Sequence, residues 1–187
     1  VREVHHRIKN NLQNVAELLQ RELGRFVDLD PRLEKAISQV DAIALVHGLQ
    51  SSGTDEAIRL GESIDNICRT IAEITQQHVL FRVSPGAAAP AALLINSEEA
   101  VSLALVLNEL VLNAVKHSPP GAPAPVVTLE GTDLGARVVV RNALCGGLAF
   151  DIGSGLGLGT GLRLVRSMLP HEGAQLRFEA DDAGFIS

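Results

Sequence analysis

The sequence predicts an α+β protein in which a helical hairpin is followed by a domain that mixes helices and strands. Apolar residues recur at spacings of three and four through the N-terminal part, which indicates amphipathic helices. Short β-rich segments follow, and they alternate with helical segments without a regular βαβ order. With 187 residues, 46% of them hydrophobic, the chain is long enough for one or two domains. We place the domain boundary between residues 1–55 and residues 56–187.

Two amphipathic helices make up the predicted hairpin. The apolar stripe of the first helix runs through residues 4–23 and ends before Gly24. Asp30 and Pro31 then supply an N-cap and a proline at the first helical position, and a second stripe runs from Leu33 to His47. A lone hairpin leaves its apolar face bare. We therefore expect a second copy of the chain to complete a four-helix bundle.

The second part is predicted to contain helices and strands in mixed order. It begins with a helix over 57–75 and a strand over 79–83. A long helix over 98–117 ends before Pro119 and Pro120, since proline cannot continue a helix. The remaining elements are an antiparallel strand pair over 126–130 and 137–141, a helix over 162–168 and a last strand over 176–180.

Composition and charge exclude several classes of function. The net charge is −6 and both Trp and Tyr are absent, so we expect no nucleic-acid partner that needs a basic groove and stacking aromatics. No uninterrupted apolar run approaches the roughly 18 residues of a membrane span, and the first residues do not form a signal peptide. Two cysteines, Cys68 and Cys145, are too few for a disulfide framework and indicate a reducing, cytoplasmic compartment.

His6 is the first candidate for chemistry. At 100° per residue it lies about 160° from the centre of the apolar stripe, so we expect it to face outward together with Lys9 and Asn10. A neutral imidazole nitrogen is a nucleophile near neutral pH, and the two neighbours are suited to orient the ring or to meet a phosphate. From geometry alone, a solvated histidine on an ordinary helix is the alternative. Zinc is not indicated, because His5 and His6 point to different faces and neither cysteine has ligand spacing.

Polar residues interrupt the apolar helix predicted over 98–117. Asn108 and Glu109 are followed at helical spacing by Asn113, Lys116 and His117, and Glu109 and Asn113 share one face. An asparagine oxygen suits Mg²⁺, which bridges phosphates, and a lysine neutralises phosphate charge. The flanking leucines and valines predict a mostly buried helix, in which polar side chains need partners. A polar stripe on a surface helix is the alternative.

A glycine-rich segment over 153–161 leads directly into the helix predicted over 162–168. Glycines let backbone N–H groups approach phosphate oxygens, and a helix N-terminus adds favourable partial charge. The segment is not a P-loop, because no Gly-Lys-Ser/Thr triplet ends it. It is not a G-x-G-x-x-G dinucleotide site either, because every register misses a glycine. A flexible linker is the alternative.

These segments together resemble a known family. Residues 3–13 (EVHHRIKNNLQ) resemble the phosphoacceptor box of HisKA_2 sensor histidine kinases and the similar box of HWE histidine kinases. Residues 42–47 resemble the second dimerisation helix of that group. Residues 107–117 and 153–162 resemble the N-box and the G2-box of the GHKL, or Bergerat-type, ATPase fold, and the order of the boxes also matches.

The resemblance implies a role for each box. It makes His6 the phosphoacceptor, with Lys9, Asn10 and Glu109 as the other catalytic candidates, and it makes Asn113 the ligand of Mg²⁺. Arg7 stands where the better-known kinase box has an acidic residue, so base-like assistance from that position is not carried over. The implied nucleotide-binding residues are Asn108, Asn113, Lys116, His117, Asn142, Gly147, Gly157, Gly159, Thr160, Gly161 and Leu162.

One box departs from the family pattern. The family has Asp-x-Gly-x-Gly between the N-box and the G2-box, and its Asp accepts a hydrogen bond from the adenine amino group. Here Asn142 occupies the Asp position and Leu144 replaces the middle glycine. An asparagine oxygen still accepts this hydrogen bond, but without charge assistance, so weaker adenine recognition or loss of nucleotide binding is expected.

The implied function is that of a two-component histidine kinase transmitter. It would form a homodimer, use ATP and Mg²⁺, phosphorylate itself on His6 and pass the phosphoryl group to an Asp of a response regulator receiver domain. We expect the sensory region to lie outside this chain, and no membrane segment within it. The alternative is a histidine phosphotransferase or pseudokinase with a degenerate ATP site that serves as phosphorelay or scaffold. A third class, an ATPase or Ser/Thr protein kinase of the same fold, would not need the histidine hairpin.

Overall fold

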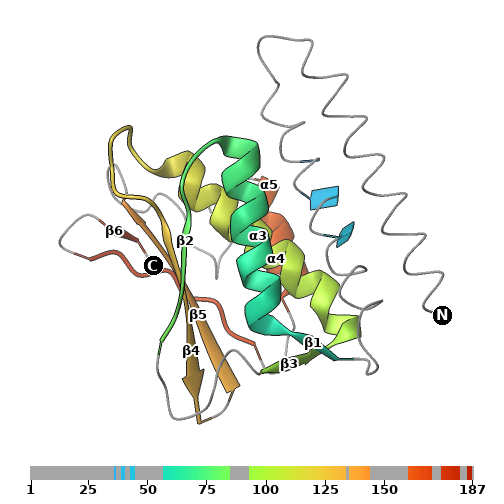
Figure 1. Ribbon diagram of the computed structural model, residues 1–187. Coiled ribbons are helices and arrows are strands. Elements are labelled where there is room, and N and C mark those ends of the chain that lie inside the picture. The colour runs from blue at the N-terminus through green and yellow to red at the C-terminus, as the bar shows by residue number, and fades with distance from the viewer. Residues whose placement is uncertain are drawn as a thin grey trace.

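The computed structural model describes residues 36, 39–40, 43–44, 57–84, 93–133, 135–143, 160–169, 174–181 and 185–186. Figure 1 shows these residues as a layer of helices packed on one face of a sheet. The elements in chain order are β1 (Ala57–Arg59), α3 (Leu60–Thr75), β2 (Leu80–Val83), β3 (Leu94–Asn96), α4 (Ser97–His117), β4 (Val126–Thr132), β5 (Gly135–Ala143), α5 (Thr160–Met168) and β6 (Phe185–Ile186). The prediction of an α+β domain is thereby confirmed for this part of the chain.

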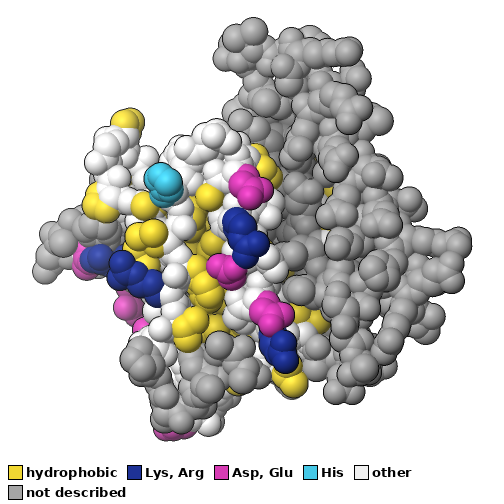
Figure 2. All heavy atoms as spheres, viewed as in Figure 1, with side chains coloured by type: hydrophobic (Ala, Val, Ile, Leu, Met, Phe, Trp, Pro, Cys, Tyr) yellow, Lys and Arg dark blue, Asp and Glu magenta, His cyan; other side chains and the backbone are white. Residues whose placement is uncertain are grey.

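Helix α3 is amphipathic and lies with its apolar side in the core. Ile64, Ile67, Cys68 and Ile71 recur at spacings of three and four and are all buried. The opposite side carries exposed ion pairs along the helix, including Arg59 with Glu62, and Figure 2 shows this row of charged side chains. The helix ends where Gln76 takes a left-handed conformation with φ of 53°.

The predicted helix over 57–75 begins three residues later than expected. Residues 57–59 form β1, which pairs antiparallel with β3, so that Ile58 lies opposite Ile95. The amide of Leu60 then donates to the carbonyl of Leu93 over 2.9 Å. This small sheet was not predicted, because three-residue strands are too short for an alternating pattern to stand out.

Helix α4 is the central helix of the domain, and its predicted burial is confirmed. Its residues 104–109, 111–112 and 114–115 are buried. By length and composition the stretch Glu99–His117 is apolar enough to cross a membrane, with 61% of the tested window buried inside the structure. Here it packs against α3, α5 and β5 as a core helix.

The larger sheet has the strand order β2-β4-β5-β6. β2 runs parallel to β4, whereas β4 and β5 form the predicted antiparallel pair, with Val127 opposite Val140. Val127 and Leu129 are fully buried and face the helices. Gly135, at the start of β5, has φ of +144°, a conformation that side chains other than glycine rarely adopt.

The predicted strand over 176–180 is wrong. Residues 174–179 have no regular structure, Ala180 forms a single bridge, and the last strand is instead β6, which pairs with the end of β5. The alternation that suggested a strand is real, because Leu176 and Phe178 are half-buried while Arg177 and Glu179 are exposed. Alternation reports which side chains face the protein. It does not report whether the backbone finds a hydrogen-bonding partner.

Only part of the predicted hairpin falls on described residues. Residues 36, 39, 40, 43 and 44 are helical, as expected for the second hairpin helix. The first helix, over 4–23, and the four-helix bundle lie outside the described residues.

Candidate functional site

The polar residues of α4 run from the interior of the domain to its surface. Asn108 and Glu109 are each only 1% exposed, Asn113 one turn later is half-buried, and Lys116 and His117 are exposed in the last turn. Glu109, Asn113 and His117 are spaced by four, so they lie along one line of the helix surface. The helix therefore presents an acid, an amide and basic groups in sequence from inside to outside.

Glu109 has a partner that the sequence did not indicate. The Nε2 atom of Gln39 donates a hydrogen bond of 2.8 Å to Oε1 of Glu109, across 70 positions of the chain. Gln39 was not predicted as a site residue, because a glutamine beside Val40 in an amphipathic helix carries no motif. Only the tertiary contact identifies it.

Asn142, the residue at the altered box, is also buried. It lies near the end of β5 and is 5% exposed. Since Val138 and Val140 pack on the core and side chains alternate along a strand, Asn142 points to the same, helix-covered face. Its Nδ2 donates to the carbonyl of Ala143 over 2.8 Å. Only the amide nitrogen is able to donate to a carbonyl, so Oδ1 points to the other side of Cγ, with its acceptor lone pairs directed away from Ala143.

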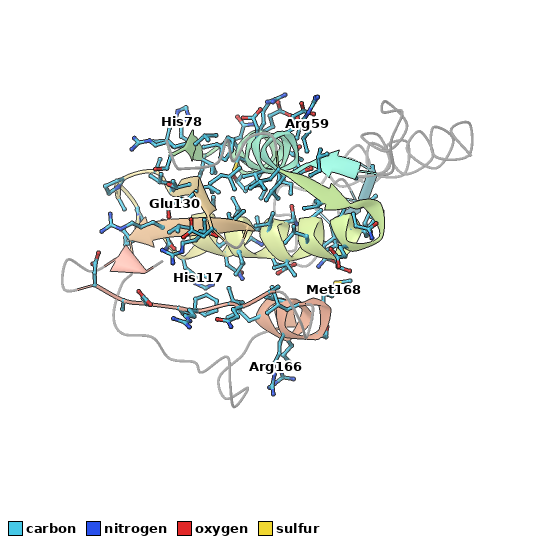
Figure 3. The ribbon with its side chains drawn as sticks, turned by 90° about the horizontal axis from the view of Figure 1, so that it is seen from below. Arg59, His78, His117, Glu130, Arg166 and Met168 are labelled. Carbon is cyan, nitrogen blue, oxygen red and sulfur yellow. The ribbon has the colours of Figure 1, made fainter. Side chains whose placement is uncertain are left out.

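Helix α5 begins at Thr160, in the last residues of the glycine-rich segment. Gly161 and Val165 are buried and Leu162 is half-buried, so this face of the helix packs against the domain. In Figure 3, α5 lies beside α4, and Arg166 projects away from it into solvent while Met168 lies on the α4 side. The first N–H groups of α5 are the type of anion-binding group that the glycine-rich segment led us to expect.

Some of the predicted site residues lie on elements that are neighbours in the structure. Helix α4, which carries Glu109 and Asn113, contacts both α5 and β5, the strand that carries Asn142. His6, Lys9, Asn10, Gly147, Gly157 and Gly159 lie outside the described residues, as does Leu144. Within the described ranges, no group of three or more His, Cys, Asp or Glu side chains gathers to hold a metal ion.

Cys68 is not one of the candidate site residues, and its thiol is unreactive at neutral pH. It is a free, buried cysteine of α3. Burial, with a smaller effect from the negative charge of Asp65, raises the pKa of its thiol from an ordinary 9.0 to about 12. At neutral pH the thiol keeps its proton, so Cys68 is not a nucleophile there.

Comparisons with known proteins show what this chain is similar to. A family model described as HisKA_2, histidine kinase, matches residues 3–75. The chain is 34% identical over 173 residues to the sensor histidine kinase PdtaS of Mycobacterium tuberculosis, and 32% identical over 120 residues to PdtaS of Mycolicibacterium smegmatis. These alignments cover 89% and 63% of this chain, but only 32% and 23% of the two relatives. The chain thus spans about a third or less of the length of these proteins.

Solved structures show the same fold. The histidine kinase domain of a blue-light activated histidine kinase from Erythrobacter litoralis superposes with a TM-score of 0.63 at 22% identity, covering 98% of this chain and 88% of that one. A longer chain of the same Erythrobacter protein gives a TM-score of 0.62 at 19% identity, covering 97% of this chain and 57% of that one.

Proposed function

We propose that this chain belongs to the HisKA_2 histidine kinases and is the transmitter part of a two-component sensor kinase. It phosphorylates itself on His6 with ATP and then passes the phosphoryl group to an Asp of a response regulator receiver domain. The observation that supports this best is that α4, which carries Glu109 and Asn113, packs against both α5 and β5, with buried Asn142 near the end of β5. Residues 1–55 would form the dimerising, phosphoacceptor domain and residues 56–187 the GHKL-type ATP-binding domain.

The described residues fit a nucleotide. Asn142 directs an amide oxygen away from Ala143, which suits the amino group of adenine. The start of α5 offers backbone N–H groups, and Gly161 with Thr160 and Leu162 would lie against the phosphates together with Gly157 and Gly159. Exposed Lys116 and His117 supply positive or hydrogen-bonding groups at the outer end of α4.

The α4 residues fit a metal-bound triphosphate. Asn113 is half-buried and offers a neutral oxygen of the kind that Mg²⁺ takes alongside water and phosphate. Mg²⁺ would neutralise charge on the phosphates. Glu109 lies one turn deeper on the same line, with Asn108 beside it, where its carboxylate orients water or the incoming imidazole.

The transfer step itself needs little covalent help from the protein. An imidazole nitrogen of His6 forms a P–N bond to the γ-phosphorus while the bond from that phosphorus to the bridging oxygen breaks. ADP leaves with the electron pair, and the remaining imidazole proton passes to water. Positioning and electrostatics supply most of the catalysis in such reactions, so Lys9 and Asn10, beside His6 on the predicted helix, would align the ring and the phosphate.

The test is autophosphorylation with ATP that carries a radioactive γ-phosphate. We expect label that acid removes, as from phosphohistidine, and its loss in His6→Ala. The control is His78→Ala, which changes an exposed histidine that follows α3. Label that survives in His6→Ala would refute the assignment of the phosphoacceptor.

The altered box favours one second candidate. If Asn142 and Leu144 abolish nucleotide binding, the chain is a phosphorelay or scaffold that receives its phosphoryl group from another protein. Calorimetric titration separates the two candidates, since saturable binding of Mg-ATP supports the kinase and its absence at millimolar nucleotide supports the relay. No nucleic acid is needed by either candidate, and both fit a cytoplasmic homodimer.

A further inference from the structure

The end of β5, which carries Asn142, extends beyond its neighbour β4. The ladder between these two strands ends at the pair Val126 and Arg141. The carbonyl of Leu129 on β4 accepts from the amide of Ser84, which follows β2. Alternate residues of a strand direct their backbone groups to opposite neighbours, so Val126 points to β5 and bonds Arg141. Asn142, the next residue, therefore directs its backbone N–H and C=O to the other side of β5, where β6 lies.

β6 pairs with this end of β5. Ile186 lies opposite Asn142, and Phe185 lies opposite Ala143. Ala143 in turn orients the side chain of Asn142, since its carbonyl accepts a hydrogen bond of 2.8 Å from Nδ2. The direction in which Oδ1 of Asn142 points thus depends on the backbone position that β6 gives to the end of β5.

An ion pair joins the same two parts of the chain on the other face of the sheet. Nη2 of Arg141 donates to Oδ2 of Asp181 over 2.5 Å, and both side chains are nearly half exposed. Val138 and Val140 pack on the core, and side chains alternate along a strand, so Arg141 points away from the helices whereas Asn142 points towards them. Asp181 therefore acts on Asn142 through the backbone of β5, without sharing its face of the sheet.

We propose that Asp181 is a positioning residue for Asn142. Its ion pair with Arg141 keeps β6 beside the end of β5, so that the amide oxygen of Asn142 is held ready for the amino group of a bound base. Such preorganisation raises affinity, because the site is ordered before the ligand arrives. An exposed ion pair of this type corresponds to an effect of about twofold to fivefold on an equilibrium. The inference rests on the proposed function in one respect, namely that Asn142 contacts adenine.

The first test is Asp181→Arg, which replaces the ion pair by two arginines. Glu130→Arg is the control, because it makes the same change of charge in the exposed ion pair of Glu130 with Arg137, which joins β4 and β5. Calorimetric titration with Mg-ATP should give a Kd about twofold to fivefold higher for Asp181→Arg than for the wild type, and no increase for Glu130→Arg. Attraction between the added positive charge and the triphosphate acts in the opposite direction, so weaker binding is not a general charge effect. An unchanged or lower Kd in Asp181→Arg would overturn the proposal.

Two comparisons separate positioning from general damage. The double variant Arg141→Asp/Asp181→Arg forms the ion pair with its partners exchanged, so it should return the Kd for Mg-ATP towards the wild-type value. Inosine triphosphate has a carbonyl oxygen where ATP has the amino group, and it offers Oδ1 of Asn142 no hydrogen there. Asp181→Arg should therefore not raise the Kd for Mg-ITP. Equal weakening for both nucleotides, or no recovery in the double variant, would refute the positioning role.

A third measurement needs no nucleotide. Because Asn142 directs its backbone N–H towards β6, loosening of β6 exposes this amide to solvent. Hydrogen–deuterium exchange of this amide, followed by NMR, should be about twofold to fivefold faster in Asp181→Arg than in the wild type, and unchanged in Glu130→Arg. Equal rates in Asp181→Arg and the wild type would show that the ion pair does not hold β6. Should the wild type bind no Mg-ATP, the proposed kinase function fails, and the exchange rate still decides the role of Asp181.

Discussion

Asn142→Asp introduces the acidic residue that the resemblance to the GHKL ATPase fold implies for this position, and two opposite effects are expected from it. Asn142 is 5% exposed and its Nδ2 donates to the carbonyl of Ala143 over 2.8 Å. An aspartate has no donor there, so one carboxylate oxygen would face a carbonyl oxygen in a buried site. Losing the bond and burying the charge should lower the free energy of unfolding by about 2–3 kcal/mol.

The affinity for ATP should change in the other direction. The repulsion at Ala143 is present with and without nucleotide, so it cancels in the binding equilibrium. In the proposed site, the hydrogen bond from the adenine amino group would become charge-assisted. Such a bond is worth about 1–1.5 kcal/mol more than a neutral one, which corresponds to roughly fivefold to tenfold tighter binding.

The assays are urea unfolding without nucleotide and calorimetric titration with Mg-ATP. Gln77→Glu serves as the charge control and should alter neither value. The combination of lower stability and tighter binding is specific, since a variant that is merely damaged would lose both. If Asn142→Asp binds ATP no more tightly than the wild type, adenine does not contact residue 142 and the assigned nucleotide site is refuted.

Two further predictions concern stability. Burial raises the pKa of the Cys68 thiol to about 12, so above pH 9.0 the unfolded chain loses a proton that the folded chain keeps. The contribution of this proton to the free energy of unfolding is complete below pH 9.0. Towards pH 12 it is lost, by about 1.4 kcal/mol per pH unit. Urea unfolding at rising alkaline pH should therefore show wild type losing stability relative to Cys68→Ala, and a constant difference would contradict the burial argument. Leu129→Ala leaves a cavity at a fully buried position between α3, α4 and the sheet, so it should lower the free energy of unfolding by about 2–5 kcal/mol. The control is Leu80→Ala on β2. Because Leu80 is 44% exposed, this change should alter the free energy of unfolding by less than about 1 kcal/mol. Equal losses in the two variants would show that the core is assigned wrongly.

Local pattern was sufficient for most elements of the mixed domain. The helices α3, α4 and α5 and the pair β4–β5 were predicted within a few residues of their bounds, because helical spacing, alternation and the Pro119-Pro120 stop are all read over short windows. The three-residue β1–β3 pair and the two-residue β6 were missed. These strands pair with partners that are distant in the chain. A segment of two or three residues is too short to show a sequence pattern that would predict such pairing.

For the site, the sequence by itself determined which residue types are available and on which helix face they lie. The spacing of Glu109 and Asn113 on one line of α4 and the resemblance to HisKA_2 kinases both came from residue order alone. Only the tertiary structure decided that Glu109 is buried and hydrogen-bonded to Gln39, and that the amide of Asn142 is oriented by Ala143. The physical reason is range: helical spacing acts within two turns, whereas the contact between Gln39 and Glu109 joins positions 70 residues apart, which only the packing of the folded chain brings together.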